Sequence, residues 1–175
     1  MSGLVSLEGG PSRAAFSAIE YRRALGAFAT GVTVVTSSGP RYRCGMTANA
    51  MTSLSLDPPL VLVCIRRGGE MSRAIAANAT FAINILAAAQ EALSRRFAAP
   101  DRARGPAAFD GVSWQPAESG APVLDGVAGH LDCRLAGMHV AGDHNIVIGS
   151  VTALAVRDEH LPLLFVHGRY AQLAS

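Results

Sequence analysis

The sequence predicts a mainly β fold with peripheral helices, in which short antiparallel strands form a closed barrel. The 175 residues match the usual length of one domain, and half of them are hydrophobic, enough for a sizeable core. About six or seven strand-like segments are joined by turns, and the helical segments do not alternate with them regularly. This pattern favours an antiparallel barrel over a parallel sheet of βαβ units.

The first element is a helix. Ser17 and Glu20 have the spacing of a capping box. Three apolar side chains then recur on one helical face: Tyr21, Leu25 and Phe28. We predict that this helix ends near Gly31, and that residues 1–15 form a flexible leader before a single domain over 16–175.

A hairpin and a central strand follow. β-Branched residues predict a strand over 32–36, and turn residues at 37–40 connect it to an extended segment over 41–47. After the proline-rich break at 57–59, the apolar run 60–65 predicts a strand in the middle of a sheet.

The middle of the chain alternates helix and strand signals. We predict a short helix over 71–78, a strand over 81–86 and a helix over 90–97. The segment 98–106 is rich in Pro, Arg and Gly and is expected to be a mobile loop.

The C-terminal third predicts a long hairpin. Between 127 and 135 apolar residues alternate with polar ones, which indicates a half-buried strand with Cys133 pointing inward and Asp132 on the other face. A turn at 141–144 leads to a strand over 145–156, and 163–166 is predicted to be the last strand.

Composition excludes several classes of function. A net charge of +2 is far from the basic surface that nucleic acid requires, so no nucleic-acid partner is expected. All fifteen basic residues are arginine, which excludes the lysine-dependent chemistry of P-loop proteins, pyridoxal-phosphate enzymes and protein kinases. G-x-G-x-x-G and G-x-S-x-G are both absent, which argues against a Rossmann site and a serine hydrolase.

Cysteine usage and hydropathy predict a cytoplasmic protein. Three cysteines at unrelated spacings fit reduced thiols better than a disulfide framework. Neither a signal peptide nor a run of about 18 apolar residues is present, so no membrane association is expected. Cys133, His139 and His144 lie close in sequence, but their spacing matches no standard zinc ligand set, so we expect no metal.

Four segments are candidates for a binding site. Small and polar residues crowd 45–53, where backbone N–H groups can approach a flat ring; the ordinary alternative is a polar loop. Residues 66–73 combine arginines with a helix start and suggest a phosphate cradle, or simply a solvated basic loop. The turn at Asp143 and His144 and the segment 168–170 are candidates for one pocket mouth, although a lone turn histidine is commonly only solvated.

Taken in order, these segments resemble the short-chain flavin reductase family, the NAD(P)H:flavin oxidoreductase components of two-component flavin monooxygenases. The resemblance extends from about Tyr21 to Leu173. It is carried by FATGVTVVT at 28–36, GMTANA at 45–50, SLSLDPPLV at 53–61, FAINIL at 81–86, GDH at 142–144, PLLF at 162–165 and GRY at 168–170.

The resemblance implies an antiparallel Greek-key split β-barrel of the FMN-binding type and a set of site residues. The flavin (FMN or FAD) would contact Thr47, Ala48, Asn49, Ala50, Met51, Ser53, Leu54, Gly68, Gly69, Glu70, Arg73, Phe97 and Ala98. NADH or NADPH would enter beside Asp143, His144 and Tyr170, with His144 positioning the nicotinamide. The resemblance also implies a homodimer and a partner monooxygenase that receives the reduced flavin.

This chemistry needs no strong acid or base from the protein. The flavin accepts the hydride, and the chain has only to stack the two rings and exclude water. Two rival functions remain: a pyridoxamine-phosphate-oxidase type of flavoenzyme, and a flavin-binding electron carrier or sensor without nicotinamide turnover.

Overall fold

A computed structural model describes residues 15–40 and 42–173. The predicted leader, apart from residue 15, lies outside this part of the chain and stays a prediction. Within the described part, α1 begins with the predicted capping box, in which the Ser17 side chain accepts from the Glu20 N–H and the Glu20 carboxylate accepts from the Ser17 N–H.

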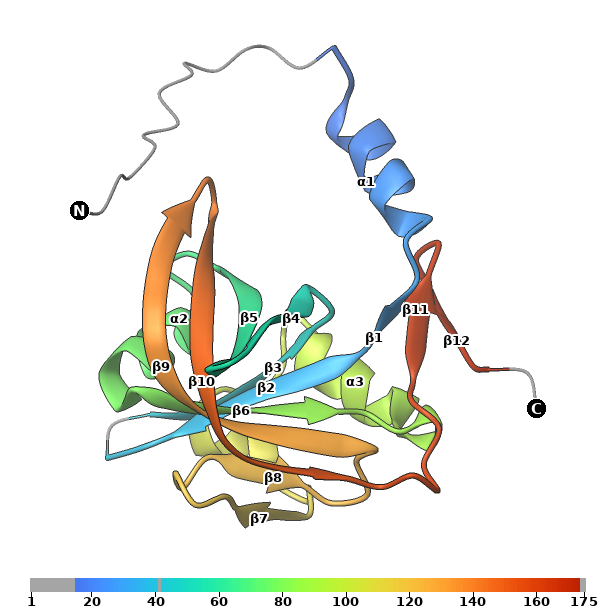
Figure 1. The fold of residues 1–175 in the computed structure, drawn as a ribbon. Coiled ribbons are helices and arrows are strands. Elements are labelled where there is room, and N and C mark those ends of the chain that lie inside the picture. The colour runs from blue at the N-terminus through green and yellow to red at the C-terminus, as the bar shows by residue number, and fades with distance from the viewer. Residues whose placement is uncertain (1–14, 41, 174–175) are drawn as a thin grey trace.

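The fold is mainly β, with three α-helices at its periphery in the described residues (Figure 1). The helices are α1 (Ala18–Gly26), α2 (Glu70–Asn78) and α3 (Glu91–Ala98), with 3₁₀ turns η1 (Ala88–Gln90) and η2 (Gly105–Phe109). The strands are β1 (Thr30–Gly31), β2 (Thr33–Ser38), β3 (Arg43–Ala48), β4 (Met51–Leu56), β5 (Pro59–Arg66), β6 (Thr80–Ile85), β7 (Trp114–Pro116), β8 (Pro122–Leu124), β9 (Gly129–Ala141), β10 (His144–Val156), β11 (Leu164–Val166) and β12 (Arg169–Ala171).

Seven strands form the main sheet, in the order β3-β2-β6-β9-β10-β5-β4, and every neighbouring pair is antiparallel. The predicted antiparallel, mainly β architecture is therefore confirmed. The two strands at the ends of this order, β3 and β4, are consecutive in the chain, so the segment at 49–50 joins the two edges. The same segment carries part of the predicted binding site.

Apolar residues fill both faces of the sheet. Strand β2 shows why, because successive side chains of a strand point to opposite faces. Val35 packs with α2 and the strands that face it, whereas Val34 packs with Phe97 of α3 and Phe109 of η2. The second of these two clusters forms the floor of the site described below.

Several predictions about the elements were wrong or incomplete. Helix α1 ends at Gly26 rather than near Gly31, because residues 30 and 31 pair with β11. No residue of α1 is buried, and its apolar side chains Tyr21 and Leu25 are exposed. Strands β4, β7, β8 and β12 were not predicted; three of them have only three residues, and β4 is an edge strand in which most residues are exposed.

Asp132 was predicted on the outer face of its strand, but it is fully buried. Its carboxylate accepts hydrogen bonds from the backbone N–H and the hydroxyl of Ser119, in a loop that covers this position. Cys133 points inward as predicted. Among the described helices, none is long and apolar enough to cross a membrane.

Candidate functional site

A cavity of about 280 Å³ opens between the end of β3, helix α3 and the β11–β12 hairpin. Its walls come from segments far apart in the sequence. They are Val32, Met46, Thr47, Ala48, Asn49, Phe97, Ala98, Arg102, Phe165 and Tyr170.

The first wall is the end of β3, with the short side chains of Thr47 and Ala48 beside Met46 and Asn49. The position of this strand is set by its pairing with β2, and the Thr33 hydroxyl donates to the Ala48 carbonyl at 2.6 Å. Further back on β3, Gly45 lies against Phe97: a Cβ at Gly45 would come within 2.6 Å of Phe97 Cε1. Glycine at 45 therefore allows the Phe97 ring to form the base of the cavity.

The facing wall is aromatic. Phe165 on β11 and Tyr170 on β12 are directly opposite in register, and their rings meet edge to face with centroids 5.3 Å apart. Phe97 packs on Phe109 at 5.4 Å, in the core beneath the cavity. A slot with small residues on one side and rings on the other suits a flat aromatic ligand.

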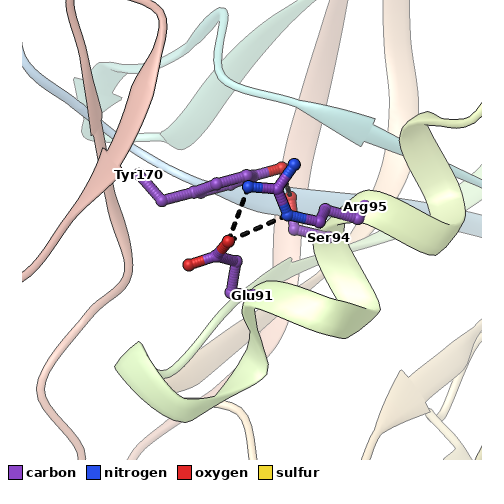
Figure 2. A network of polar contacts seen from close by, with 4 residues as sticks. All are labelled: Glu91, Ser94, Arg95 and Tyr170. Atoms are coloured by element: carbon purple, nitrogen blue, oxygen red, sulfur yellow. Dashed lines mark hydrogen bonds and ion pairs between the residues drawn. The ribbon is translucent and has the colours of Figure 1, made fainter.

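Helix α3 connects the two walls. Ser94 is fully buried; its carbonyl accepts from the Thr47 hydroxyl at 2.7 Å, and its hydroxyl lies 2.9 Å from the Tyr170 hydroxyl. One position along, the Arg95 guanidinium lies 4.7 Å from the centroid of the Tyr170 ring and pairs with Glu91 (Figure 2).

Positive charge borders the cavity on its other side. Arg102 lines both this cavity and an adjoining one of about 270 Å³, to which Arg96 and Asp101 also contribute. The Arg96 side chain is held by the carbonyls of Ala108 and Asp110, whereas Arg102 donates one N–H to the Ala99 carbonyl. Arg102 is thus the arginine that contributes to the lining of both cavities.

The predicted phosphate cradle lies close to Arg102. Gly68 has a φ of 70°, in the left-handed region, and Gly69 is the N-cap of α2 without a side-chain cap. Glu70 accepts from the Gly105 N–H at 2.9 Å, which attaches the 99–105 loop to this helix start. Burial, together with the charge of Glu70, raises the pKa of the nearby Cys44 thiol to about 12, and the charge of Arg102 acts in the opposite direction.

Asp143 and His144 lie elsewhere, at the tip of the β9–β10 hairpin. His144 Nδ1 is 2.8 Å from the Asp143 carboxylate, and this hydrogen bond, with the charge of His144, lowers the pKa of Asp143. Both side chains are exposed, and His144 is opposite Arg66 in the pairing with β5. Figure 1 shows this tip and the β11–β12 hairpin at opposite sides of the molecule.

The structure therefore gathers part of the predicted site in one place. The predicted residues that line the cavity are Thr47, Ala48, Asn49, Phe97, Ala98 and Tyr170. Those outside its lining are Ala50, Met51, Ser53, Leu54, Gly68, Gly69, Glu70, Arg73, Asp143 and His144. Within one chain Asp143 and His144 do not share a pocket mouth with Tyr170, because the two hairpins that carry them extend from different parts of the fold.

Four lining residues were not predicted: Val32, Met46, Arg102 and Phe165. Three of them, Val32, Met46 and Phe165, lie in segments that carried the resemblance, and they reach the cavity through the pairing of their segments in the fold. Arg102 lies in the arginine-containing loop 98–106. Its positive charge was the sequence feature that could have identified it as a binding residue.

The groups considered for zinc are separated. Cys133 is buried in the core, and burial raises the pKa of its thiol to about 12, whereas His144 lies at the exposed hairpin tip. Across residues 15–40 and 42–173, no cluster of three or more His, Cys, Asp or Glu residues has the arrangement of a metal site.

Comparisons with known proteins show which family the chain belongs to. The family model described as "Flavin reductase like domain" matches residues 25–174. The NADH-dependent FAD reductase of Streptomyces globisporus is 42% identical over 157 residues, which are 89% of this chain and 86% of that protein. The FMN reductase (NADH) SmoA of Agrobacterium fabrum is 42% identical over 154 residues, 88% of this chain and 85% of that protein.

A third relative and a solved structure extend the comparison. The reductase subunit HsaB of a flavin-dependent monooxygenase from Rhodococcus jostii is 35% identical over 166 residues, covering 95% of this chain and 83% of that protein. The structure of the Streptomyces globisporus NADH:FAD oxidoreductase SgcE6 with NAD and FAD fragments superposes with a TM-score of 0.83, at 40% identity, over 89% of this chain and 92% of that one.

Proposed function

Because the chain belongs to the flavin reductase-like domain family, we propose that it reduces a flavin, FMN or FAD, with hydride from NADH. The observation that carries this proposal is the slot between the small residues of β3 and the aromatic wall of β11–β12, bordered by Arg102. The slot offers an apolar enclosure for flat rings and a positive charge for a phosphate.

The flavin would lie along β3. Thr47, Ala48 and Asn49 line the cavity and would border the ring system, and Ala50 and Met51 continue the same backbone. Ser53 and Leu54, on the exposed edge strand β4, would meet the outer part of the ring or its ribityl chain. Phe97 and Ala98 close the base of the slot.

The phosphate end would extend toward the start of α2. Gly68 and Gly69 expose backbone, and the first turn of α2 has N–H groups that no side chain caps. Arg102 lies in the loop that Glu70 holds through the Gly105 N–H. Arg73 donates to the Gly68 carbonyl, so in the proposed complex it would support the loop while Glu70 holds the 99–105 segment in place.

These residues fit the flavin, and their task is to position it. The flavin supplies the hydride-accepting ring when bound. The chain's own groups stack the rings at contact distance, exclude water with Phe97, Phe165 and Tyr170, and present backbone N–H groups to the polar ring edge. Among the residues that line the cavity, none is an Asp, Glu or His that could transfer a proton.

Tyr170 would meet the nicotinamide nucleotide, and Asp143 and His144 would contact it from a second subunit. A homodimer is part of this proposal, because the hairpin tip does not reach the cavity of its own chain. The support is apolar surface left exposed: Phe28, Ile19, Leu56, Leu154 and Val156 are each at least 65% exposed. In a dimer such surfaces would be buried between subunits.

We also propose that a partner monooxygenase takes the reduced flavin. The proposed location of the protein is the cytoplasm. The partner is supported by the relative that is named as a monooxygenase reductase subunit. The location is supported by Cys44, Cys64 and Cys133, which are all free thiols.

The proposal is tested by following NADH oxidation with free FMN or FAD in large excess over the purified protein. A reductase consumes many equivalents of NADH per protein molecule. A flavin-binding carrier or sensor stops after one equivalent, and that result would refute the proposed function. Anaerobic mixing, followed through the loss of the oxidised flavin band, shows which flavin is reduced and whether NADPH replaces NADH.

A further inference from the structure

The aromatic wall of the cavity is carried by a small and weakly paired piece of sheet. Strand β12 lies at the edge of the three-stranded sheet β1-β11-β12 and pairs with β11 at only three positions. Strand β1, on the other side of β11, contributes two residues. So short a sheet has few hydrogen bonds with which to fix its own position. The place of Tyr170 must therefore depend on contacts outside the sheet.

Ser94 supplies such a contact, and it does so from the opposite side of the cavity. Its hydroxyl lies 2.9 Å from the Tyr170 hydroxyl, as Figure 2 shows, and its carbonyl accepts from Thr47 at 2.7 Å. Thr47 belongs to the β3 wall and Tyr170 to the facing wall. One buried residue of α3 is thus bonded to both sides of the slot.

Two further contacts hold the ring of Tyr170 but leave its hydroxyl to Ser94. Phe165 packs against the ring at an interplanar angle of 70°, and the Arg95 guanidinium lies over the ring. These contacts act on the plane of the ring. The bond to Ser94 acts at the far end of the side chain, where it sets the distance between the β12 wall and α3.

We propose that Ser94 is a positioning residue for nicotinamide binding: through the hydroxyl of Tyr170 it fixes the width of the slot in which the second ring stacks. This inference rests on the proposed flavin reductase function. It assigns no proton transfer to Ser94 or Tyr170. Their bond holds one wall in place before NADH arrives, so that binding need not order that wall.

The test removes the same bond from either end. Ser94→Ala and Tyr170→Phe should each raise the KM for NADH about five- to tenfold, which is the range for loss of one partly buried hydrogen bond, while kcat stays within about twofold. The dissociation constant of the flavin, from fluorescence quenching, should change less than about twofold, since alanine at 94 keeps the carbonyl that binds Thr47. The double variant should be no worse than the poorer single variant, because both substitutions remove one and the same interaction.

Glu91→Gln is the matched control, because it weakens an exposed ion pair in the same network and leaves the two hydroxyls untouched. Its KM for NADH should stay within about twofold of the unsubstituted protein. An unchanged KM in both Ser94→Ala and Tyr170→Phe, or effects that multiply in the double variant, would overturn the role of Ser94. Should Ser94→Ala fail to fold, Tyr170→Phe tests the same bond from its less buried end. Absence of NADH turnover in the unsubstituted protein would overturn the proposed function instead, so the two failures are distinct.

Discussion

The cavity and the tip of the β9–β10 hairpin are two regions with candidate functional residues, and they are built in different ways. The cavity is enclosed by β3, α3 and β11–β12 and rests on the buried rings of Phe97 and Phe109. The hairpin tip holds Asp143 and His144 in solvent, bonded mainly to each other. The residues that line the cavity thus all come from one chain, whereas Asp143 and His144 at the tip lie outside that cavity.

The largest effect should come from the base of the cavity. Phe97→Ala removes a ring that is 1% exposed, and we expect it to lower the free energy of unfolding by about 3–5 kcal/mol and to weaken flavin binding more than about tenfold. Phe81→Ala is the control, because Phe81 is equally buried but packs in the other core cluster. Chemical denaturation and flavin fluorescence measure the two quantities. Equal loss of flavin binding in both variants would show that the cavity depends on overall stability and not on this ring.

Gly45→Ala should have the next largest effect. The new Cβ would lie 2.6 Å from Phe97 Cε1, so the ring must move and the base of the cavity changes shape. We expect a loss of about 1–3 kcal/mol in unfolding free energy, together with a several-fold weaker flavin affinity.

Gly149→Ala is the matched control for this substitution. Its Cβ would lie 2.5 Å from Phe81 Cζ, which is the same kind of overpacking outside the cavity lining. The unfolding free energy should fall by a similar amount while the flavin affinity stays unchanged. A flavin affinity that falls equally in both variants would contradict the assignment of the cavity.

At the hairpin tip the effect should appear in one kinetic constant alone. We expect His144→Ala to raise the KM for NADH about three- to tenfold and to leave the flavin dissociation constant and the unfolding free energy nearly unchanged, since the side chain is exposed in one chain. Steady-state kinetics and flavin titration check this. A large loss of flavin binding would refute the proposed role of His144. It would also show that the hairpin tip, like the cavity, contributes to flavin binding.

The smallest expected effect concerns a second histidine on the same hairpin, at its base. Burial lowers the pKa of His130 below its usual 6.5, with Asp132 acting in the opposite direction. As the pH falls through 6.5, the unfolded chain binds a proton that the folded chain does not, so stability decreases toward acid. Between pH 7.5 and 5.5 the midpoint of thermal unfolding should fall less in His130→Gln than in the unsubstituted protein. Identical slopes would show that His130 does not contribute to this pH dependence.

Local sequence patterns predicted those elements that are long and strongly patterned. The apolar run of β5, the alternation along β9 and the capping box of α1 each correspond to an observed feature. Strand β4 was missed because its hydroxyl-rich sequence resembles a loop, and it is a strand only because β5 lies beside it. The burial of Asp132 was missed for a similar reason, since Ser119 is distant in sequence.

The residues of the candidate site also fall into two groups, those that a local sequence pattern predicted and those that only the folded structure reveals. Thr47, Ala48 and Asn49 were found because small and polar residues concentrate in one short segment. Arg102 and Phe165 enter the cavity through the packing of a loop and a short strand, which no local pattern encodes. The separation of His144 from Tyr170 also depends on the arrangement of two hairpins in space.

Helix α1 has nine residues, none of them buried, and its C-terminal end is attached through the bond from the His167 N–H to the Gly26 carbonyl. A peptide helix of this length is marginal in water even with a good cap. Its amide hydrogens should therefore exchange rapidly with deuterium in dilute protein and slowly once another surface covers its apolar side chains. The exchange rate of this one segment, followed against protein concentration, would then report directly on self-association.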